Sequence, residues 1–228
     1  MYGKIFDVRT AGFLRGHAMK SDALRFPALQ EVRGYWEALR NGNEPPKRAD
    51  VDPRGLAGAL EQAFMLERVA PGVARFRIAG MKLSDVMGMD VRGMPLLSLI
   101  DPPARAEFAL ALEQVFAGPA MLEMALEAER GIGRPALEAR LLILPLRDHY
   151  GATKLAMGCL ATEGAIGRCP RRFAIARKIV TPVRATSQIV ETQPELAMGM
   201  AEAPAPFVIP ARPAPGQPFL RLVKTDRT

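Results

Sequence analysis

The amino-acid sequence predicts an α+β fold, with an antiparallel sheet whose helices gather on one face. The chain has 228 residues, 49% of them hydrophobic, and a mean hydropathy of +0.03, values that suit a soluble globular core. Its hydrophobic periodicity predicts, in order, a helix, two strands, several short helices, one longer helix and three strands. Because this order does not alternate strand with helix, as a parallel sheet requires, we expect five antiparallel strands.

The N-terminal part is expected to hold a flexible arm, one helix and the start of a second. Residues 1–20 show only weak periodicity. A helix is predicted within residues 26–42, because four apolar side chains recur there at helical spacing: Leu29, Val32, Trp36 and Leu39. After a proline-bearing linker, Asp52 as N-cap and Pro53 at the first helical position predict the second helix.

A β-hairpin is predicted around the turn Pro71-Gly72, because Phe76 and Ile78 alternate with arginines in the run that follows it. Residues 81–100 are interrupted by glycine and proline and indicate short helical turns. Asp101-Pro102 then begins a longer helix, whose apolar stripe includes Phe108, Leu112, Val115 and Phe116.

Three further strands are expected in the runs 121–129, 135–148 and 152–163, with a bulge or a break at Pro145. We therefore assign residues 21–165 to one domain that includes the N-terminal helix. Residues 166–228 are predicted to be a basic segment and a proline-rich, largely irregular tail that is partly disordered. Within the basic segment the run FAIARKIV favours a short helix, limited by Thr181-Pro182.

Spaced motifs across residues 24–165 carry a family resemblance. They are Tyr35-Trp36 with Leu39-Arg40, Pro46-x-Arg48 leading to Asp50-x-Asp52-Pro53, Phe76-Arg77-x-Ala79-Gly80, Gly88, Gly93, and LLILPL before Gly158. This set resembles a group of small bacterial proteins with a single PAS domain. The resemblance implies a five-stranded antiparallel sheet, a cup of short helices over one face, and a cavity between them.

A methionine cluster suggests how such a cavity would be lined. Met81 stands where the family pattern has a small polar residue, and Met87, Met89 and Met94 follow closely. Methionine fills irregular cores and also adapts to apolar guests, so core packing and a hydrophobic or aromatic ligand both stay open. The ligand contacts expected are Phe76, Ile78, Met81, Leu83, Met87, Met89, Leu142 and Leu144.

The sequence offers little material for catalysis or cofactor binding. His17 and His149 are the two histidines, and neither lies on the short helices where a PAS haem ligand is expected. Cys159 and Cys169 form no metal or disulfide framework, which predicts a reducing, cytoplasmic setting. Nucleophile and phosphate-binding motifs are absent from the sequence, so we expect a non-enzymatic protein without haem, flavin or metal.

Two interaction surfaces are suggested. The first helix could form a homodimer contact through Val32, Tyr35, Trp36 and Leu39, unless Trp36 packs on its own sheet. The chain carries a formal charge of +7, and its segment 168–184 is basic without acidic residues. That segment is either a solvated basic stretch or a site for nucleic acid or an anionic membrane.

These observations favour a sensory or adaptor domain that acts in signal transduction by small-ligand binding and protein–protein interaction. Two alternatives stay open. One is an interaction scaffold whose core is filled by its own side chains. The other is a binder of nucleic acid or anionic membrane through the basic segment.

Overall fold

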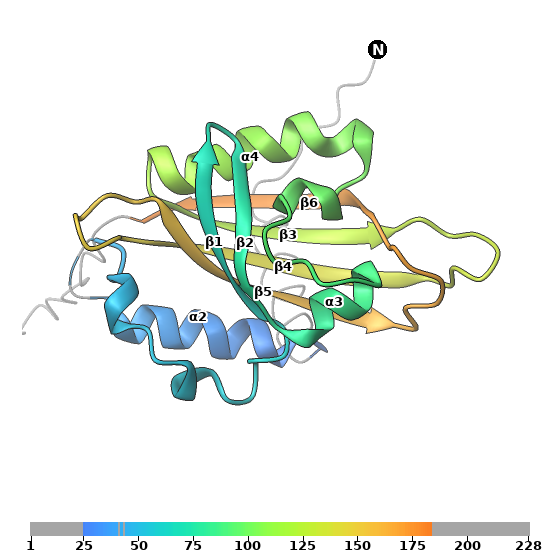
Figure 1. Cartoon of the computed structure of the whole chain (residues 1–228), viewed down its shortest axis with the longest axis horizontal. Coiled ribbons are helices and arrows are strands. Elements are labelled where there is room, and N and C mark those ends of the chain that lie inside the picture. Colours follow the sequence, from blue (N-terminus) through green and yellow to red (C-terminus); the bar gives the residue numbers. More distant parts are fainter. Residues whose placement is uncertain (1–24, 41, 43, 184–228) are drawn as a thin grey trace, which may run out of the picture. The chain divides into compact units, whose positions relative to one another are not determined.

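A single six-stranded antiparallel sheet organises the domain, in the order β2-β1-β5-β4-β3-β6 (Figure 1). The computed structural model describes residues 25–40, 42 and 44–183. The predictions for the arm 1–20 and for the tail beyond residue 183 therefore lie outside the described residues. The strands are β1 (Ala63–Ala70), β2 (Val73–Ala79), β3 (Ala120–Ala128), β4 (Leu137–Leu146), β5 (Leu155–Gly164) and β6 (Phe173–Pro182).

Within the described residues, the helical elements are three α-helices and four short 3₁₀ turns, as part of the same α+β fold that the sequence predicts. The helices are α2 (Pro27–Leu39), α3 (Met81–Met87) and α4 (Arg105–Ala117). The turns are η1 (Arg48–Asp50), η2 (Pro53–Leu56), η3 (Leu96–Leu99) and η4 (Pro102–Ala104). Asp52 caps η2 as expected, accepting a hydrogen bond from the Arg54 amide at 2.9 Å. The second helix, however, is only this one turn.

The central strands are buried on both faces of the sheet. Along β4, Leu141 and Ile143 belong to the core beneath α3 and α4. Their neighbours Leu142 and Leu144 belong to a second core beneath α2. In Figure 1, α2 accordingly covers the face opposite α4. Successive strand residues point to opposite faces, so one apolar run supplies both cores.

Residues Phe173–Pro182 of the basic segment form a strand rather than a helix or an irregular stretch. FAIARKIV forms most of β6, which pairs antiparallel with β3 and extends the sheet beyond residue 165. Lys178 pairs with Glu107 of α4 at 2.7 Å. Arg171 is fully buried just before the strand. This segment therefore offers fewer solvated cations to an anionic partner than its composition suggests.

Strand β2 contains a β-bulge that changes the direction of Ile78. Leu66 of β1 pairs with Phe76, whereas the adjacent Met65 pairs with Ile78, so Arg77 is an extra residue without a register partner. Directly paired residues share a face of the sheet. Phe76 therefore points into the core beneath α3 and α4, and Ile78 points to the α2 face. The sequence-based expectation that these two side chains share a face is wrong.

The hairpin β1–β2 is fastened to α4 by one carboxylate. Glu113 accepts hydrogen bonds from Arg68 Nε at 3.1 Å, from Arg68 Nη2 at 2.6 Å and from the Gly72 amide at 2.8 Å. The hydrogen bonds from Arg68, and then the one from Gly72, hold the pKa of Glu113 below its usual value of 4.5, although burial acts in the opposite direction.

Glu113→Gln is expected to lower the free energy of unfolding by about 1–2 kcal/mol at pH 7. The folded-state pKa is lowered, so the stabilisation is present above pH 4.5 and is lost as the pH falls through the lowered pKa. The gap between wild type and variant should thus close in acid. Urea unfolding at several pH values measures it, with the exposed Glu127→Gln as control. A gap independent of pH would contradict this role for Glu113.

Candidate functional site

An apolar cleft of about 340 Å³ lies between the η1–η2 segment and the sheet. Arg48 is the charged member of its lining. The other lining residues are nonpolar: Val51, Pro53, Leu56, Leu60, Ala63, Phe64, Met65, Ile78, Ala79, Gly80 and Met157. A cleft of this size and character is typical of small-molecule sites, which range from about 300 to 1,000 Å³.

A row of cross-strand neighbours forms the floor of this cleft. Met65 of β1 pairs with Ile78 of β2 on one side and with Met157 of β5 on the other. The row continues to Leu144 of β4, which is covered by α2. Ile78 is 54% exposed at the outer end, whereas Met65 is buried. The floor therefore runs from solvent toward the core beneath α2.

The segment that covers the cleft is tied to α2 by three hydrogen bonds. The Tyr35 hydroxyl donates to the Asp52 carbonyl at 3.0 Å and accepts from the Asp52 amide at 2.7 Å. The Gly58 amide donates to Glu31 Oε1 at 2.9 Å. Gly55 lies so close to the Tyr35 ring that a Cβ there would be 2.2 Å from it. A guest in the cleft would consequently touch a segment that α2 holds in place.

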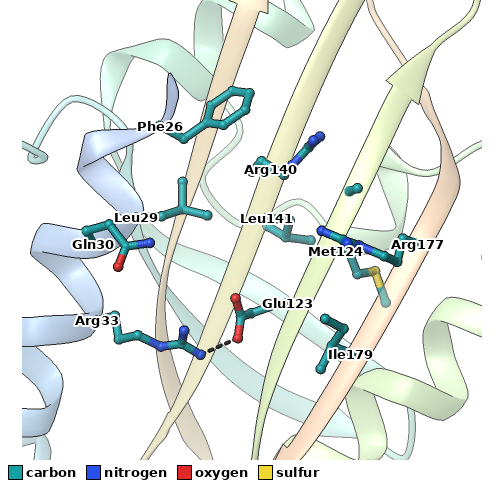
Figure 2. A pocket seen from close by; sticks show the side chains of 11 residues that line it. Phe26, Leu29, Gln30, Arg33, Glu123, Met124, Arg140, Leu141, Arg177 and Ile179 are labelled. Atoms are coloured by element: carbon teal, nitrogen blue, oxygen red, sulfur yellow. Dashed lines mark hydrogen bonds and ion pairs between the residues drawn. The ribbon is translucent and has the colours of Figure 1, made fainter. Parts of the chain in front are cut away.

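A second, smaller hollow of about 140 Å³ lies beside α2 over β3, β4 and β6 (Figure 2). Arg33 of α2 reaches across it to form an ion pair with Glu123 of β3, drawn as the dashed line. The Arg140 guanidinium stands over the Phe26 ring, 5.0 Å from its centroid. Charged side chains occupy much of this hollow, so it suits an apolar ligand less well than the larger cleft.

The eight predicted ligand residues do not converge on one cavity. Ile78 lines the apolar cleft, and Leu142 and Leu144 are buried on the same face but beneath α2. Phe76, Leu83 and Met87 lie on the opposite face, in the core beneath α3 and α4.

Met81 and Met89, the other two predicted ligand residues, are 61% and 53% exposed. The apolar run of β4 places side chains on both faces of the sheet, and the bulge in β2 turns Ile78 to the face opposite Phe76. The expectation of a single pocket lined by all eight residues is therefore wrong.

The predicted dimer contact is also wrong for its central residues. Val32 and Trp36 are fully buried in the core beneath α2, and the Trp36 indole donates to the Pro145 carbonyl at 2.9 Å. Leu39 packs partly against the same core, and Tyr35 is bonded to Asp52. Trp36 thus packs on its own sheet, and its ring is unavailable to a second copy.

A family comparison decides what kind of domain surrounds the cleft. The sequence model described as PAS domain matches residues 24–161, more than half of the chain. This chain belongs to the PAS domain family. PAS domains are typical of sensory signal-transduction modules. No curated protein matches the chain significantly in sequence.

Solved structures similar to this PAS domain include two states of one light-oxygen-voltage domain and one light-oxygen-voltage receptor. The light state of the blue-light photoreceptor Aureochrome1 LOV has 17% identity and a TM-score of 0.35, over 49% of this chain and 88% of its own. Its dark structure has 17% identity and a TM-score of 0.37, over 55% and 89%. An RNA-binding Light-Oxygen-Voltage Receptor has 18% identity and a TM-score of 0.37, over 54% and 37%.

In this PAS domain, side chains occupy the space between the sheet and helices α3 and α4. Phe64 and Phe76 meet edge to face there, with ring centroids 5.5 Å apart. Phe108 and Leu112 of α4 and Leu83 of α3 are fully buried against the same sheet face. The cup that family resemblance predicts is therefore present, and its interior is packed with the protein's own residues.

The Cys159 thiol of the PAS domain is poorly suited to reaction. Cys159 lies on β5 and packs in the core beneath α2, on the face opposite α3 and α4. Burial, together with the nearby Glu31 carboxylate, raises the pKa of its thiol to about 12. The thiol therefore stays protonated and a weak nucleophile. Cys169 is half-buried and donates to the Asp85 carbonyl at 3.0 Å.

Among residues 25–40, 42 and 44–183, no group of three or more His, Cys, Asp or Glu side chains is arranged to hold a metal ion. His149 lies next to the turn at Tyr150, and their ring centroids are 3.7 Å apart. None of the helices in this part of the chain is long and apolar enough to cross a membrane.

Proposed function

We propose that this PAS domain is a cytoplasmic sensory or adaptor module that binds a small apolar ligand and signals through protein contacts, without catalysis. The observation that carries the proposal is the apolar cleft, whose covering segment is hydrogen-bonded to α2. The interior of the cup, between the sheet and helices α3 and α4, is packed with side chains. This packing supports a ligand site in the apolar cleft rather than inside the cup. The two unpaired thiols support a reducing compartment.

Ligand occupancy would act by favouring one of two positions of the η1–η2 segment. A guest in contact with Leu56 and Leu60 stabilises the position that leaves room for it. Tyr35 and Glu31 transmit that position to α2, because they hydrogen-bond to the segment. The signal would then be read on the solvent side of α2 by a partner protein or by a second copy of the chain.

Tyr35→Phe tests this coupling. The variant removes both hydrogen bonds to Asp52 but keeps the ring that packs against Gly55. We expect an apolar ligand, found by native mass spectrometry, to bind the variant within about threefold of wild type. We also expect the ligand-induced change in hydrogen exchange across α2 to be largely lost.

Tyr150→Phe is the matched control, since Tyr150 is 84% exposed and lies away from the cleft. An unchanged exchange response in Tyr35→Phe would contradict the coupling.

A second candidate function is an interaction scaffold that senses nothing. The packing between α3, α4 and the sheet favours it, because that space needs no guest to be stable. If purified protein carries no apolar molecule and binds none from a chemically diverse library, the scaffold replaces the sensor.

A further inference from the structure

The mouth of the apolar cleft is cationic. An adjoining open hollow of about 490 Å³ shares Arg48, Met65 and Ile78 with the cleft and adds Arg77 and Leu155. Two guanidinium groups thus flank the point where the apolar floor reaches solvent. The combination of an apolar floor and a cationic mouth matches a ligand with an apolar body and an anionic end.

Arg48 is the better placed of the two cations. Its backbone is fixed, because its amide donates to the Arg147 carbonyl at 2.8 Å and its carbonyl accepts from the Val51 amide at 3.2 Å. Its guanidinium makes one long contact, 3.4 Å to the Val51 carbonyl. Arg48 forms no ion pair with any carboxylate in residues 44–183. A carboxylate at the mouth would therefore not have to displace another carboxylate from Arg48.

Arg77 is already engaged, although weakly. It lies 3.4 Å from Glu67, and both side chains are about half exposed, at 56% and 44%. Exposed pairs of this kind contribute little to stability. Arg77 can therefore turn toward an anion at the mouth, while Glu67 disfavours a second negative charge there.

We infer that the cleft binds a medium-chain aliphatic carboxylate, with its chain along Ile78, Met65 and Met157 and its carboxylate at Arg48. This inference rests on the proposed ligand-binding function and names the chemical class of the ligand. Each methylene buried on the floor should strengthen binding about fourfold. The planar guanidinium can hold both carboxylate oxygens, which gives the head group its specificity.

The test compares sodium decanoate with 1-decanol by isothermal titration on the full chain, below micellar concentrations. Decanoate should bind at least about tenfold more tightly than decanol, and hexanoate and octanoate progressively less tightly than decanoate. Arg48→Gln should lower the affinity for decanoate about tenfold or more and leave the affinity for decanol unchanged. Arg54→Gln, an exposed arginine on η2, should change neither.

A second pair of variants tests the floor. Ile78→Asp should lower the affinity for both ligands. Val69→Asp should change neither affinity, because Val69 lies outside the cleft; it is a matched control, since its side chain is similarly exposed, at 50%. Equal binding of decanoate and decanol to wild type would overturn the carboxylate inference while leaving an apolar sensor intact. Absence of binding by decanoate at 1 mM and by decanol up to its solubility limit would overturn the inference. The library search decides separately whether the sensor survives. Decanoate binding insensitive to both Arg48→Gln and Ile78→Asp would place the ligand elsewhere and also overturn it.

Discussion

Trp36→Ala is expected to lower the free energy of unfolding by about 3–5 kcal/mol, enough to leave much of the protein unfolded at 37 °C. Trp36 is fully buried in the core beneath α2, where truncation leaves a large cavity. Its indole also donates to the Pro145 carbonyl, which would lose this partner. Chemical denaturation followed by circular dichroism measures the loss.

A graded series separates packing from hydrogen bonding at this position. Trp36→Phe keeps most of the apolar volume but removes the N–H donor, so it should cost less than Trp36→Ala, about 1–3 kcal/mol. Gln30→Ala on the exposed side of α2 should change stability by less than about 0.5 kcal/mol. A Trp36→Ala protein that is as stable as wild type, but monomeric where wild type is a dimer, would contradict the burial of Trp36 in its own core. It would instead support a role of Trp36 in a dimer interface.

Arg171→Met is the second change with a large expected effect, about 3 kcal/mol or more. The Arg171 guanidinium donates to the carbonyls of Ile166, Glu129 at 2.8 Å and Pro135 at 2.9 Å. Methionine is of similar length but cannot donate, so three partly buried carbonyl acceptors lose their partner. Burial, and then the cation of Arg134, lower the pKa of Arg171, so the folded protein bears a cost for this charge.

The neighbouring arginine provides the control for that variant. Arg172 is exposed, and Arg172→Met should have an effect within about 0.5 kcal/mol. Thermal melts of both variants at one pH make the comparison. Equal stability of Arg171→Met and wild type would show that the three carbonyls find other partners, which would contradict the role assigned here.

Elements with a clear local pattern could be predicted from the sequence. The helical spacing of Val32 and Trp36 gave α2, and the stripe from Phe108 to Phe116 gave α4. The hairpin around Pro71-Gly72 and the three later strands followed from turn residues between apolar runs. For the two helices, neighbouring residues carry the information because one face of the helix is buried and the other is wet.

The cleft depended on features that local pattern does not contain. The run that includes Leu141 and Leu142 is apolar on both faces, so alternation could not say which side chains share a pocket. The bulge at Arg77 is set by pairing with β1, and it moves Ile78 to the other face. Strand β6 forms because β3, about fifty residues earlier, pairs with it, which outweighs its ambiguous local preference.

The strand order also determines how much of the chain must be synthesised before the sheet can form. β1–β2 and β4–β5 join neighbours in the chain, but the pair β1–β5 joins Ala63 to Cys159. Closing so long a loop is entropically unfavourable, and such pairings form slowly. While the chain emerges from the ribosome, β1 therefore has no central neighbour until β5 has been made, and Met65 and Leu66 stay open to other chains during that interval.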